Sequence, residues 1–324
     1  MTRTSGLGLD EDGSGVLSGQ IPPILVTGIP RSGTTWVGRM LTASREVGYI
    51  NEPFNLAVSP GTFRIPVDHW YEYISAANEA QILPQLRRAL EFEYPLLREL
   101  RRCRNRTDLL HALRSWRGFV RSRHRRPLVK EPHAVFSIPW FAERLASDVV
   151  VTVRHPAAVV SSWKRLDWSF DFSNLLDQPA LMRDWLEPFR REMQAALAPD
   201  KTLVDRVALL WGVIYSVIDR QRGSCPRLHV VRQEDLSRDP VEEYAKVFDS
   251  LGLSFTSAAA EAVRAASSQE NPKETNPENP HDTRIDSRAN LENWKRRLTS
   301  DELAGIRRLT EATADLYYSD LEWE

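Results

Sequence analysis

The sequence predicts an α/β fold of three layers, with helices on both faces of a central parallel sheet. Short apolar runs rich in β-branched residues alternate along the chain with longer stretches of helical periodicity, which is the pattern of such a sheet. Each run is continuously apolar, as expected of a strand that is covered on both faces. The expected strands are residues 24–27, 47–50, 128–130, 149–153 and 228–231.

Longer segments supply the predicted helices. Between the second and third strands, leucines recur at helical spacing, so we expect a helical insertion over about residues 70–126, packed beside the ligand edge of the sheet. A continuous apolar stripe predicts a central helix over residues 203–222, and a last helix is expected over residues 301–318. We expect these stripes to pack in the core.

The chain is predicted to form a single domain over residues 21–324, because no linker or internal repeat divides it. Residues 1–20 have no apolar core and carry acids, so we expect a disordered tail and not a signal peptide. Over about residues 268–292, prolines, asparagines and acids without periodicity predict a long loop, and its length suggests a lid.

Composition restricts the class of protein. Lys and Arg (43) nearly balance Asp and Glu (44), so the net charge gives no argument for a nucleic-acid or membrane partner. No apolar run approaches the roughly 18 residues of a membrane span. The two cysteines form no C-x-x-C pair, which excludes a thiolate zinc site and is compatible with a reducing compartment. We therefore expect a cytoplasmic globular protein, whose oligomeric state stays open.

Arginine recurs continually between Arg87 and Arg126, whereas lysine is rare in the whole chain. One interpretation is a basic surface for an anionic acceptor. The other is a set of solvated helix faces, which is favoured by the acidic residues that interrupt the run.

The first expected strand enters the loop "GIPRSGTT", residues 28–35, and a helical pattern leaves it. This layout is P-loop-like, because backbone N–H groups and the helix dipole favour an anion at such a turn. Gly28 and Gly33 have the spacing of a nucleoside-triphosphate loop, but Thr34 stands where that motif has its lysine. The loop therefore predicts a phosphate site of another kind.

A second anion site is predicted after the fourth strand. Arg154 ends that strand, Pro156 suits the first turn of the next helix, and Ser162 follows about two helical turns later. Each of these features is common by itself, so the segment gains its significance only together with the first loop.

Taken together, P-R-S-G-T-T-W in the first loop and R-x-P-x-x-x-x-x-S in the later segment resemble the sulfotransferase family, whose donor is 3′-phosphoadenosine 5′-phosphosulfate (PAPS). The stretches "RLHVVRQEDL" and "NLENWKRRLTSDEL" are similar to later segments of that family, so the resemblance covers most of residues 22–318. It implies transfer of a sulfuryl group to an acceptor hydroxyl, with 3′-phosphoadenosine 5′-phosphate (PAP) as the second product.

The resemblance also implies a donor site. The first loop would hold the 5′-phosphosulfate, with its arginine beside the bridging oxygen, and the second segment would hold the 3′-phosphate. The donor-binding residues are predicted to be Arg31, Ser32, Gly33, Thr34, Thr35, Trp36, Arg154, Ser162 and, from the lid loop, Arg288. Gln233 replaces the aromatic residue that packs adenine in many relatives, which leaves the adenine contacts open.

The catalytic base has two candidates. "YINEPFNL" resembles the F-E-P element of carbohydrate sulfotransferases and related bacterial enzymes, in which a glutamate is the base, so Glu52 is the first candidate. The cytosolic phenol and hormone enzymes use a histidine, and His133 is displaced by one residue from the comparable position. Lys130 is expected either to aid the bridging oxygen or to be a solvated strand end. No metal is expected, because no His, Cys and Asp cluster has ligand spacing.

The acceptor is the least determined part. A glycan or glycosylated metabolite fits the Glu52 segment, and it would be anionic if the arginine run is a basic acceptor surface, but a lipid, glycopeptide or small alcohol fits nearly as well. Two other classes stay open: a P-loop kinase or GTPase, which needs the loop lysine that this chain lacks, and a noncatalytic nucleotide-binding protein.

Overall fold

Five parallel strands form the centre of the computed structural model, which describes residues 21–57, 61–276 and 282–324. The strands are β1 Ile24–Thr27, β2 Val47–Asn51, β3 Arg126–Lys130, β4 Asp148–Val153 and β5 Leu228–Arg232. Their order in the sheet is β2-β3-β1-β4-β5, so the first strand is central. Every predicted strand is present, with ends shifted by at most two residues.

Helices account for most of the remaining described chain. The longer ones are α1 Thr34–Leu41, α2 Glu79–Leu90, α3 Leu96–Arg102, α4 Arg106–Ser122, α5 Ile138–Leu145, α6 Pro156–Arg165, α9 Arg190–Ala195, α10 Leu203–Arg222, α11 Gln233–Arg238, α12 Pro240–Ser250, α13 Ser257–Ser267 and α14 Ser300–Ala314. The other helical segments are α7 Ser173–Leu176, α8 Pro179–Leu181, η1 Thr42–Ser44, η2 Pro132–Ser137, η3 Met182–Leu186, η4 Glu187–Phe189, η5 Ala289–Arg296 and η6 Asp320–Trp323. The central helix α10 has the predicted bounds.

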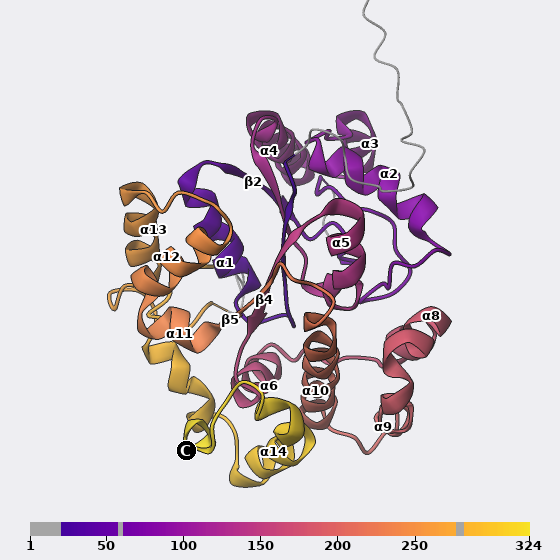
Figure 1. Cartoon of the computed structure of the whole chain (residues 1–324), viewed down its shortest axis with the longest axis vertical. Helices are drawn as coiled ribbons and strands as arrows, with labels where there is room; N and C mark the ends of the chain where they lie inside the picture. The colour runs from indigo at the N-terminus through magenta and orange to yellow at the C-terminus, as the bar shows by residue number, and fades with distance from the viewer. Residues whose placement is uncertain (1–20, 58–60, 277–281) are drawn as a thin grey trace, which may run out of the picture.

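Different helices cover the two faces of the sheet (Figure 1). Leu25 of β1 packs on one face with residues of α5 and α10, whereas its neighbours Ile24 and Val26 pack on the other face with α1, α12 and α13. Successive side chains of a strand point to opposite faces, so both faces of the central strand are buried. The predicted three-layer, P-loop-like α/β fold is thus confirmed.

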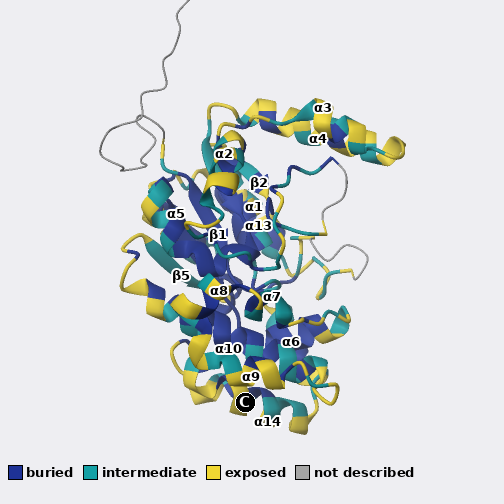
Figure 2. Cartoon of the chain, turned by 90° about the vertical axis from the view of Figure 1, so that its right-hand side faces the viewer, coloured by how far each residue is buried: buried dark blue, intermediate teal, exposed yellow. Residues whose placement is uncertain are grey.

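The insertion between β2 and β3 differs from the prediction in its place. Its helices α2, α3 and α4 lie at one end of the molecule (Figure 2). A Cβ on Gly48 of β2 would lie 2.4 Å from the ring of Phe92 and 2.6 Å from Ser122, so the insertion packs tightly on this edge strand. Because α4 ends only a few residues before β3 begins, its last turn lies at the amino ends of the strands. The expectation that the insertion of residues 70–126 packs beside the ligand edge is therefore wrong for α2 to α4, and only its first residues, Trp70 and Tyr71, lie at that edge.

The carboxyl ends of the parallel strands meet at the opposite edge of the sheet, where ligands of such folds bind. The loop of residues 28–33 follows β1, Glu52 follows β2, Glu131 follows β3, Arg154 follows β4 and Gln233 follows β5. The predicted tail, residues 1–20, and the centre of the predicted lid loop, residues 277–281, lie outside the described residues.

Candidate functional site

The small-residue loop after β1 is fixed by close backbone packing. Gly28 has φ of 137°, and a Cβ there would lie 2.4 Å from the backbone oxygen of Thr152, so the position requires glycine. Ser32 Oγ lies 2.7 Å from Thr152 Oγ1, which ties the loop to β4. Helix α1 begins at Thr34 with no acidic residue in its first turn. Its first N–H groups can therefore attract an anion.

The two segments that the sequence predicts as separate anion sites contact each other. Arg31 Nε donates a hydrogen bond to Ser162 Oγ at 3.0 Å, and Arg154 Nη1 donates to the backbone oxygen of Arg31 at 3.2 Å. As predicted, Arg154 directly follows its strand and Pro156 is the first residue of α6. The two segments thus form one continuous wall.

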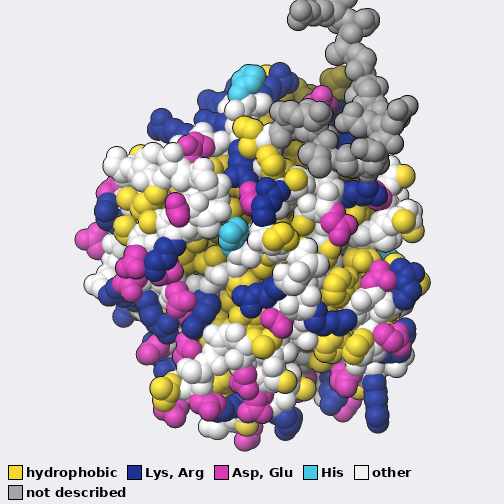
Figure 3. Space-filling model, in the orientation of Figure 1, with side chains coloured by type: hydrophobic (Ala, Val, Ile, Leu, Met, Phe, Trp, Pro, Cys, Tyr) yellow, Lys and Arg dark blue, Asp and Glu magenta, His cyan; other side chains and the backbone are white. Residues whose placement is uncertain are grey.

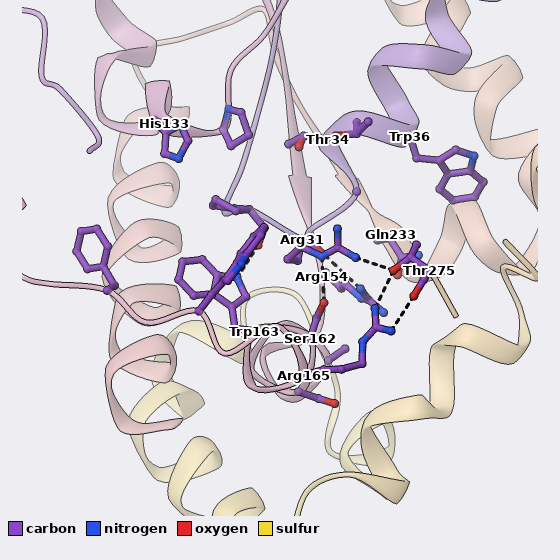
Figure 4. A pocket seen from close by; sticks show the side chains of 18 of the residues that line it. Arg31, Thr34, Trp36, His133, Arg154, Ser162, Trp163, Arg165, Gln233 and Thr275 are labelled. Atoms are coloured by element: carbon purple, nitrogen blue, oxygen red, sulfur yellow. Dashed lines mark hydrogen bonds between the residues drawn. The ribbon is translucent and has the colours of Figure 1, made fainter. Parts of the chain in front are cut away.

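This wall borders a cavity of about 750 Å³ (Figure 4), which lies within the range of small-molecule sites. Most of the predicted site residues line it, namely Arg31, Gly33, Thr34, Thr35, Trp36, Glu52, His133, Arg154 and Ser162. Ser32 and Lys130 are not among the lining residues and are buried behind them. The fold therefore gathers one site from all five strand ends.

Four arginines, Arg31, Arg154, Arg165 and Arg297, line the cavity. Figure 4 shows the first three converging beside Ser162 and Thr275. Burial, together with the charges of Arg154 and Arg165, lowers the pKa of Arg31 to about 10. Burial also lowers the pKa of Arg154, although the charge of Glu234 opposes it. Gathering buried cations is unfavourable unless an anion compensates them, so the arrangement favours a polyanionic ligand.

Several buried polar atoms at the cavity have no hydrogen-bond partner among the described residues. They are Nε of Arg154, Nε of Arg165, Nε1 of Trp36 and Oε1 of Gln233. Buried polar groups are normally hydrogen-bonded, so these atoms mark positions where a bound ligand or water would complete the site.

Two residues of the predicted lid loop, Glu274 and Thr275, contact the arginines that line the cavity. Thr275 Oγ1 accepts hydrogen bonds from Arg165 Nη2 at 2.7 Å and from Arg31 Nη2 at 3.2 Å. Glu274 forms ion pairs with Arg297 and, at 3.6 Å, with Arg165. The carboxylate of Glu274 thus supplies part of the negative charge that a bound anion would bring.

Glu52 and Lys130 form a buried ion pair at the side of the cavity. Asn55 Nδ2 also donates a hydrogen bond to Glu52. Burial would raise the pKa of Glu52, but the charge and hydrogen bond of Lys130 outweigh it, so the pKa is lowered. Burial lowers the pKa of Lys130, and Glu52 opposes that shift. Lys130 is therefore not the solvated strand end of one sequence interpretation.

His133 lines the cavity and is held by a neighbouring carboxylate. Its Nδ1 lies 2.9 Å from Glu131 Oε1, and Glu131 also accepts hydrogen bonds from the backbone N–H groups of His133 and Phe54. The ring centre of Trp70 lies 4.6 Å from that of His133. With the Glu131 carboxylate as acceptor, Nδ1 carries the proton of the neutral ring and Nε2 keeps its lone pair.

Arg288 is the one predicted site residue that the structure does not bring to the others. Its guanidinium donates to the backbone oxygen of Arg238 at 2.9 Å, its side chain is 60% exposed, and it does not line the cavity. It lies within the predicted lid loop, directly before η5, and its side chain points to the outside. Arg297, further along the chain, lies at the cavity instead.

Sequence reasoning missed Arg165, Arg297, Glu274 and Thr275. Arg165 follows Ser162 by three residues on α6, so helical spacing could have indicated that both side chains share one face. No sequence signal identifies the other three, since their position depends on how the lid loop folds back.

Nowhere in the described part of the chain do three or more His, Cys, Asp or Glu side chains form a group suited to a metal ion. None of the described helices is both long enough and apolar enough to cross a membrane.

The chain has no significant match among curated proteins. Among solved structures, it is similar to the sulfotransferase domain of the curacin biosynthetic pathway, at 14% identity and a TM-score of 0.46, over 93% of this chain and 99% of that one. It is also similar to sulfotransferase STF9 from Mycobacterium avium, at 13% identity and a TM-score of 0.44, over 93% of this chain and 78% of that one. A third similar structure is mouse sulfotransferase SULT7A1 complexed with PAP, at 13% identity and a TM-score of 0.43, over 93% of this chain and 86% of that one.

A family model matches the amino-acid sequence itself. The model of the sulfotransferase family matches residues 22–257, which include the loop after β1, Glu52, His133 and Arg154. That range is well over half of the chain. The chain therefore belongs to the sulfotransferase family.

Proposed function

We propose that the protein transfers the sulfuryl group of PAPS to an acceptor hydroxyl and releases PAP. The observation that carries this proposal is the contact between Arg31 and Arg154, which joins two cationic segments along one cavity. PAPS carries negative charge at both its 5′ and 3′ positions, so it requires cations at two points of one site. Membership of the sulfotransferase family supports the same donor.

The donor roles follow from the position of each group. The N–H groups of the loop and of the first turn of α1, with Thr34 and Thr35, would hold the 5′-phosphosulfate, whereas the Ser32 side chain would hold the loop on β4 through Thr152. Arg31 would neutralise charge on its bridging oxygen. Arg154 and Ser162 would hold the 3′-phosphate. The adenine would lie toward Trp36 and Gln233, because Nε1 of Trp36 and Oε1 of Gln233 have no hydrogen-bond partner among the described residues.

The proposed step is an in-line transfer. The bond between sulfur and the 5′-phosphate oxygen breaks, its electron pair stays on that oxygen, and a new bond forms between sulfur and the acceptor oxygen. The acceptor proton passes to a base of the protein. By analogy with phosphoryl transfer, catalysis consists mainly of positioning and stabilisation of charge.

We propose Glu52 as that base and His133 as its competitor. In the described arrangement, Lys130 lowers the pKa of Glu52 and therefore its strength as a base. Glu52 can take the acceptor proton effectively only if Lys130 transfers its hydrogen bond to the sulfate or bridging oxygen when the donor binds. This exchange would give both Lys130 and Glu52 a role. His133 would need no such exchange, because Glu131 already holds its proton on Nδ1.

The proposed acceptor is a hydroxyl of a glycan or glycosylated metabolite. Trp70, Trp168 and Phe170 line the cavity, and aromatic rings of this kind offer broad faces to the apolar sides of sugar rings. Anionic character of the acceptor has no such support, because no residue of α2, α3 or α4 lines the cavity. A kinase is disfavoured by Thr34 at the position of the loop lysine and by the family match.

The test is turnover of PAPS with a panel of neutral glycosides, sulfated glycosides, alcohols and phenols. The proposal predicts that PAP and a product heavier by one SO₃ group form together, as measured by mass spectrometry. Arg154→Ala should lower the rate at limiting PAPS, whereas the matched control Arg288→Ala should not. PAP binding without turnover of any acceptor would favour a noncatalytic nucleotide-binding protein.

A further inference from the structure

The charge of the chain is distributed unevenly. Residues 96–126, which include α3 and α4, hold eleven arginines and two acids, whereas the whole chain has a net charge of −1. One of the acids, Glu99, is fully buried and pairs with Arg98 and Arg102. The exposed arginines include Arg101, Arg104, Arg106, Arg114, Arg117, Arg121 and Arg123. None of these residues lines the cavity, so the proposed reaction does not account for the basic segment.

The same segment exposes large apolar side chains. The exposed fractions are 74% for Leu97, 41% for Leu109, 53% for Leu110, 36% for Trp116 and 41% for Val120. They make up half of the large hydrophobic residues that are exposed in the described chain. We call these side chains and the exposed arginines around them the α3–α4 surface.

Helix α4 presents these two kinds of side chain side by side. Leu109, Trp116 and Val120 recur at spacings of seven and four residues, which places them on one side of the helix. The core-facing residues Ala112 and Phe119 are buried along the adjoining side. Arg114, Arg117 and Arg121 recur at spacings of three and four residues and form a neighbouring row. The apolar stripe thus lies between the core and a row of cations.

The α3–α4 surface is prominent in shape. Figure 2 shows α3 and α4 as the outermost layer at one end of the molecule. In Figure 3, the visible part of the same end carries Lys and Arg side chains and hydrophobic ones. The surface is therefore a basic, apolar ridge, and it is separate from the cavity.

We propose that the α3–α4 surface binds the interface of an anionic lipid bilayer. Exposed arginines are attracted to anionic headgroups, while leucine, valine and tryptophan side chains beside them enter the boundary between headgroups and acyl chains. A nucleic acid would use the arginines but would leave the apolar stripe in water. The inference does not depend on the donor or acceptor of the proposed reaction.

Flotation with lipid vesicles tests the proposal. The full chain should float with vesicles that contain about one third phosphatidylglycerol and not with pure phosphatidylcholine, and high salt should weaken its binding. The combined variant Arg114→Glu, Arg117→Glu and Arg121→Glu should lose binding at least about tenfold. The matched control, Arg191→Glu with Arg264→Glu and Arg308→Glu, reverses three exposed arginines on other helices and should bind like the wild type.

A second variant separates apolar insertion from charge alone. Leu110→Ser with Trp116→Ser keeps every arginine and should also weaken vesicle binding several-fold, since it removes apolar area from the ridge. Unchanged PAP affinity in each variant checks that the chain is folded. Absence of wild-type flotation with anionic vesicles overturns the proposal, as does an equal loss in the control variant. An oligonucleotide that binds the Leu110→Ser, Trp116→Ser variant as tightly as the wild type and displaces both from vesicles would assign the surface to nucleic acid instead.

Discussion

Lys130 and Glu52 form a buried ion pair between the ends of β3 and β2. The pair follows from strand register, because Lys130 is the partner of Asn51 in the parallel pairing and Glu52 is the next residue. Glu52 also has φ of 44°, in the left-handed region, where a non-glycine residue is uncommon. The backbone thus turns sharply at Glu52, which lines the cavity while it pairs with Lys130.

The first prediction concerns the base. A carboxylate base must be ionised, and a histidine base must be neutral, to accept a proton. In both cases activity is lost as the pH falls through the pKa of the base. Lys130 lowers the pKa of Glu52, so a Glu52 base places the acid limb of kcat/KM for PAPS below the reference of about 4.3. If Lys130 transfers its hydrogen bond to the bound donor, the acid limb of kcat should lie at a higher pH than the acid limb of kcat/KM. An acid limb near the general histidine reference of about 6.5 would instead indicate a histidine base.

Mutation separates the two candidates. Glu52→Gln should lower kcat by roughly 10²- to 10⁴-fold with PAP affinity close to wild type. The fall in kcat should be far smaller in His133→Ala, and smaller still in Glu131→Gln. The opposite pattern, with His133→Ala inactive and Glu52→Gln nearly normal, would assign the proton to the histidine.

The second prediction concerns the 3′-phosphate. Arg154→Ala should weaken PAP binding by about ten- to a hundredfold, because it removes a charge-assisted contact worth roughly 1.5 to 3 kcal/mol. The rate at saturating PAPS should change little, since the 3′-phosphate does not change charge in the reaction. Calorimetry measures the affinity, and Arg288→Ala is the exposed control. Unchanged affinity in a folded Arg154→Ala protein would remove Arg154 from the site.

The third prediction concerns the lid loop. Glu274 pairs with Arg165 and Arg297 at the cavity, so its carboxylate should compete with donor phosphates. Glu274→Gln should therefore increase PAP affinity by several-fold, and PAP should slow protease cleavage near Thr275 in the wild type. The control Glu270→Gln alters an exposed carboxylate of the same loop. A weaker affinity in Glu274→Gln would mean that the carboxylate supports the bound donor.

The fourth prediction concerns the loop after β1. Gly28→Ala should destabilise the protein by at least about 1 to 3 kcal/mol, because the new methyl group would meet the Thr152 backbone at a positive φ. Gly118→Ala, on the open side of α4, should be neutral or stabilising. Denaturant unfolding compares the two. Equal stability of both variants would show that the loop can shift away from β4.

The sequence was most informative where local rules decide the structure. Continuous apolar runs identify all five strands, and Pro156 marks the start of α6, because strand burial and helix initiation depend on neighbouring residues. Arg154 and Ser162 reach the cavity for the same reason, since one ends a strand and the other lies on the following helix.

Other features depend on tertiary packing. The Glu52 and Lys130 pair requires the register of β2 and β3, which residue patterns alone do not specify. Arg288 and Arg297 are both arginines near the end of the lid loop, and only the path of η5 decides that the second one reaches the cavity. The helices α2 to α4 of the insertion lie elsewhere than predicted, because helical periodicity predicts a buried face but not the edge of the sheet on which that face packs.

The central claim is that the cavity binds a donor with phosphates at both the 3′ and 5′ positions. Calorimetry with PAP and with ADP tests it most directly, because both are adenosine nucleotides with two phosphates, and the second phosphate is on the 3′ oxygen in PAP but on the 5′-phosphate in ADP. The account predicts that PAP binds at least about tenfold more tightly than ADP, that ATP binds weakly, and that Arg154→Ala removes the preference for PAP. Equal affinity for PAP, ADP and ATP, retained in Arg154→Ala, would contradict it.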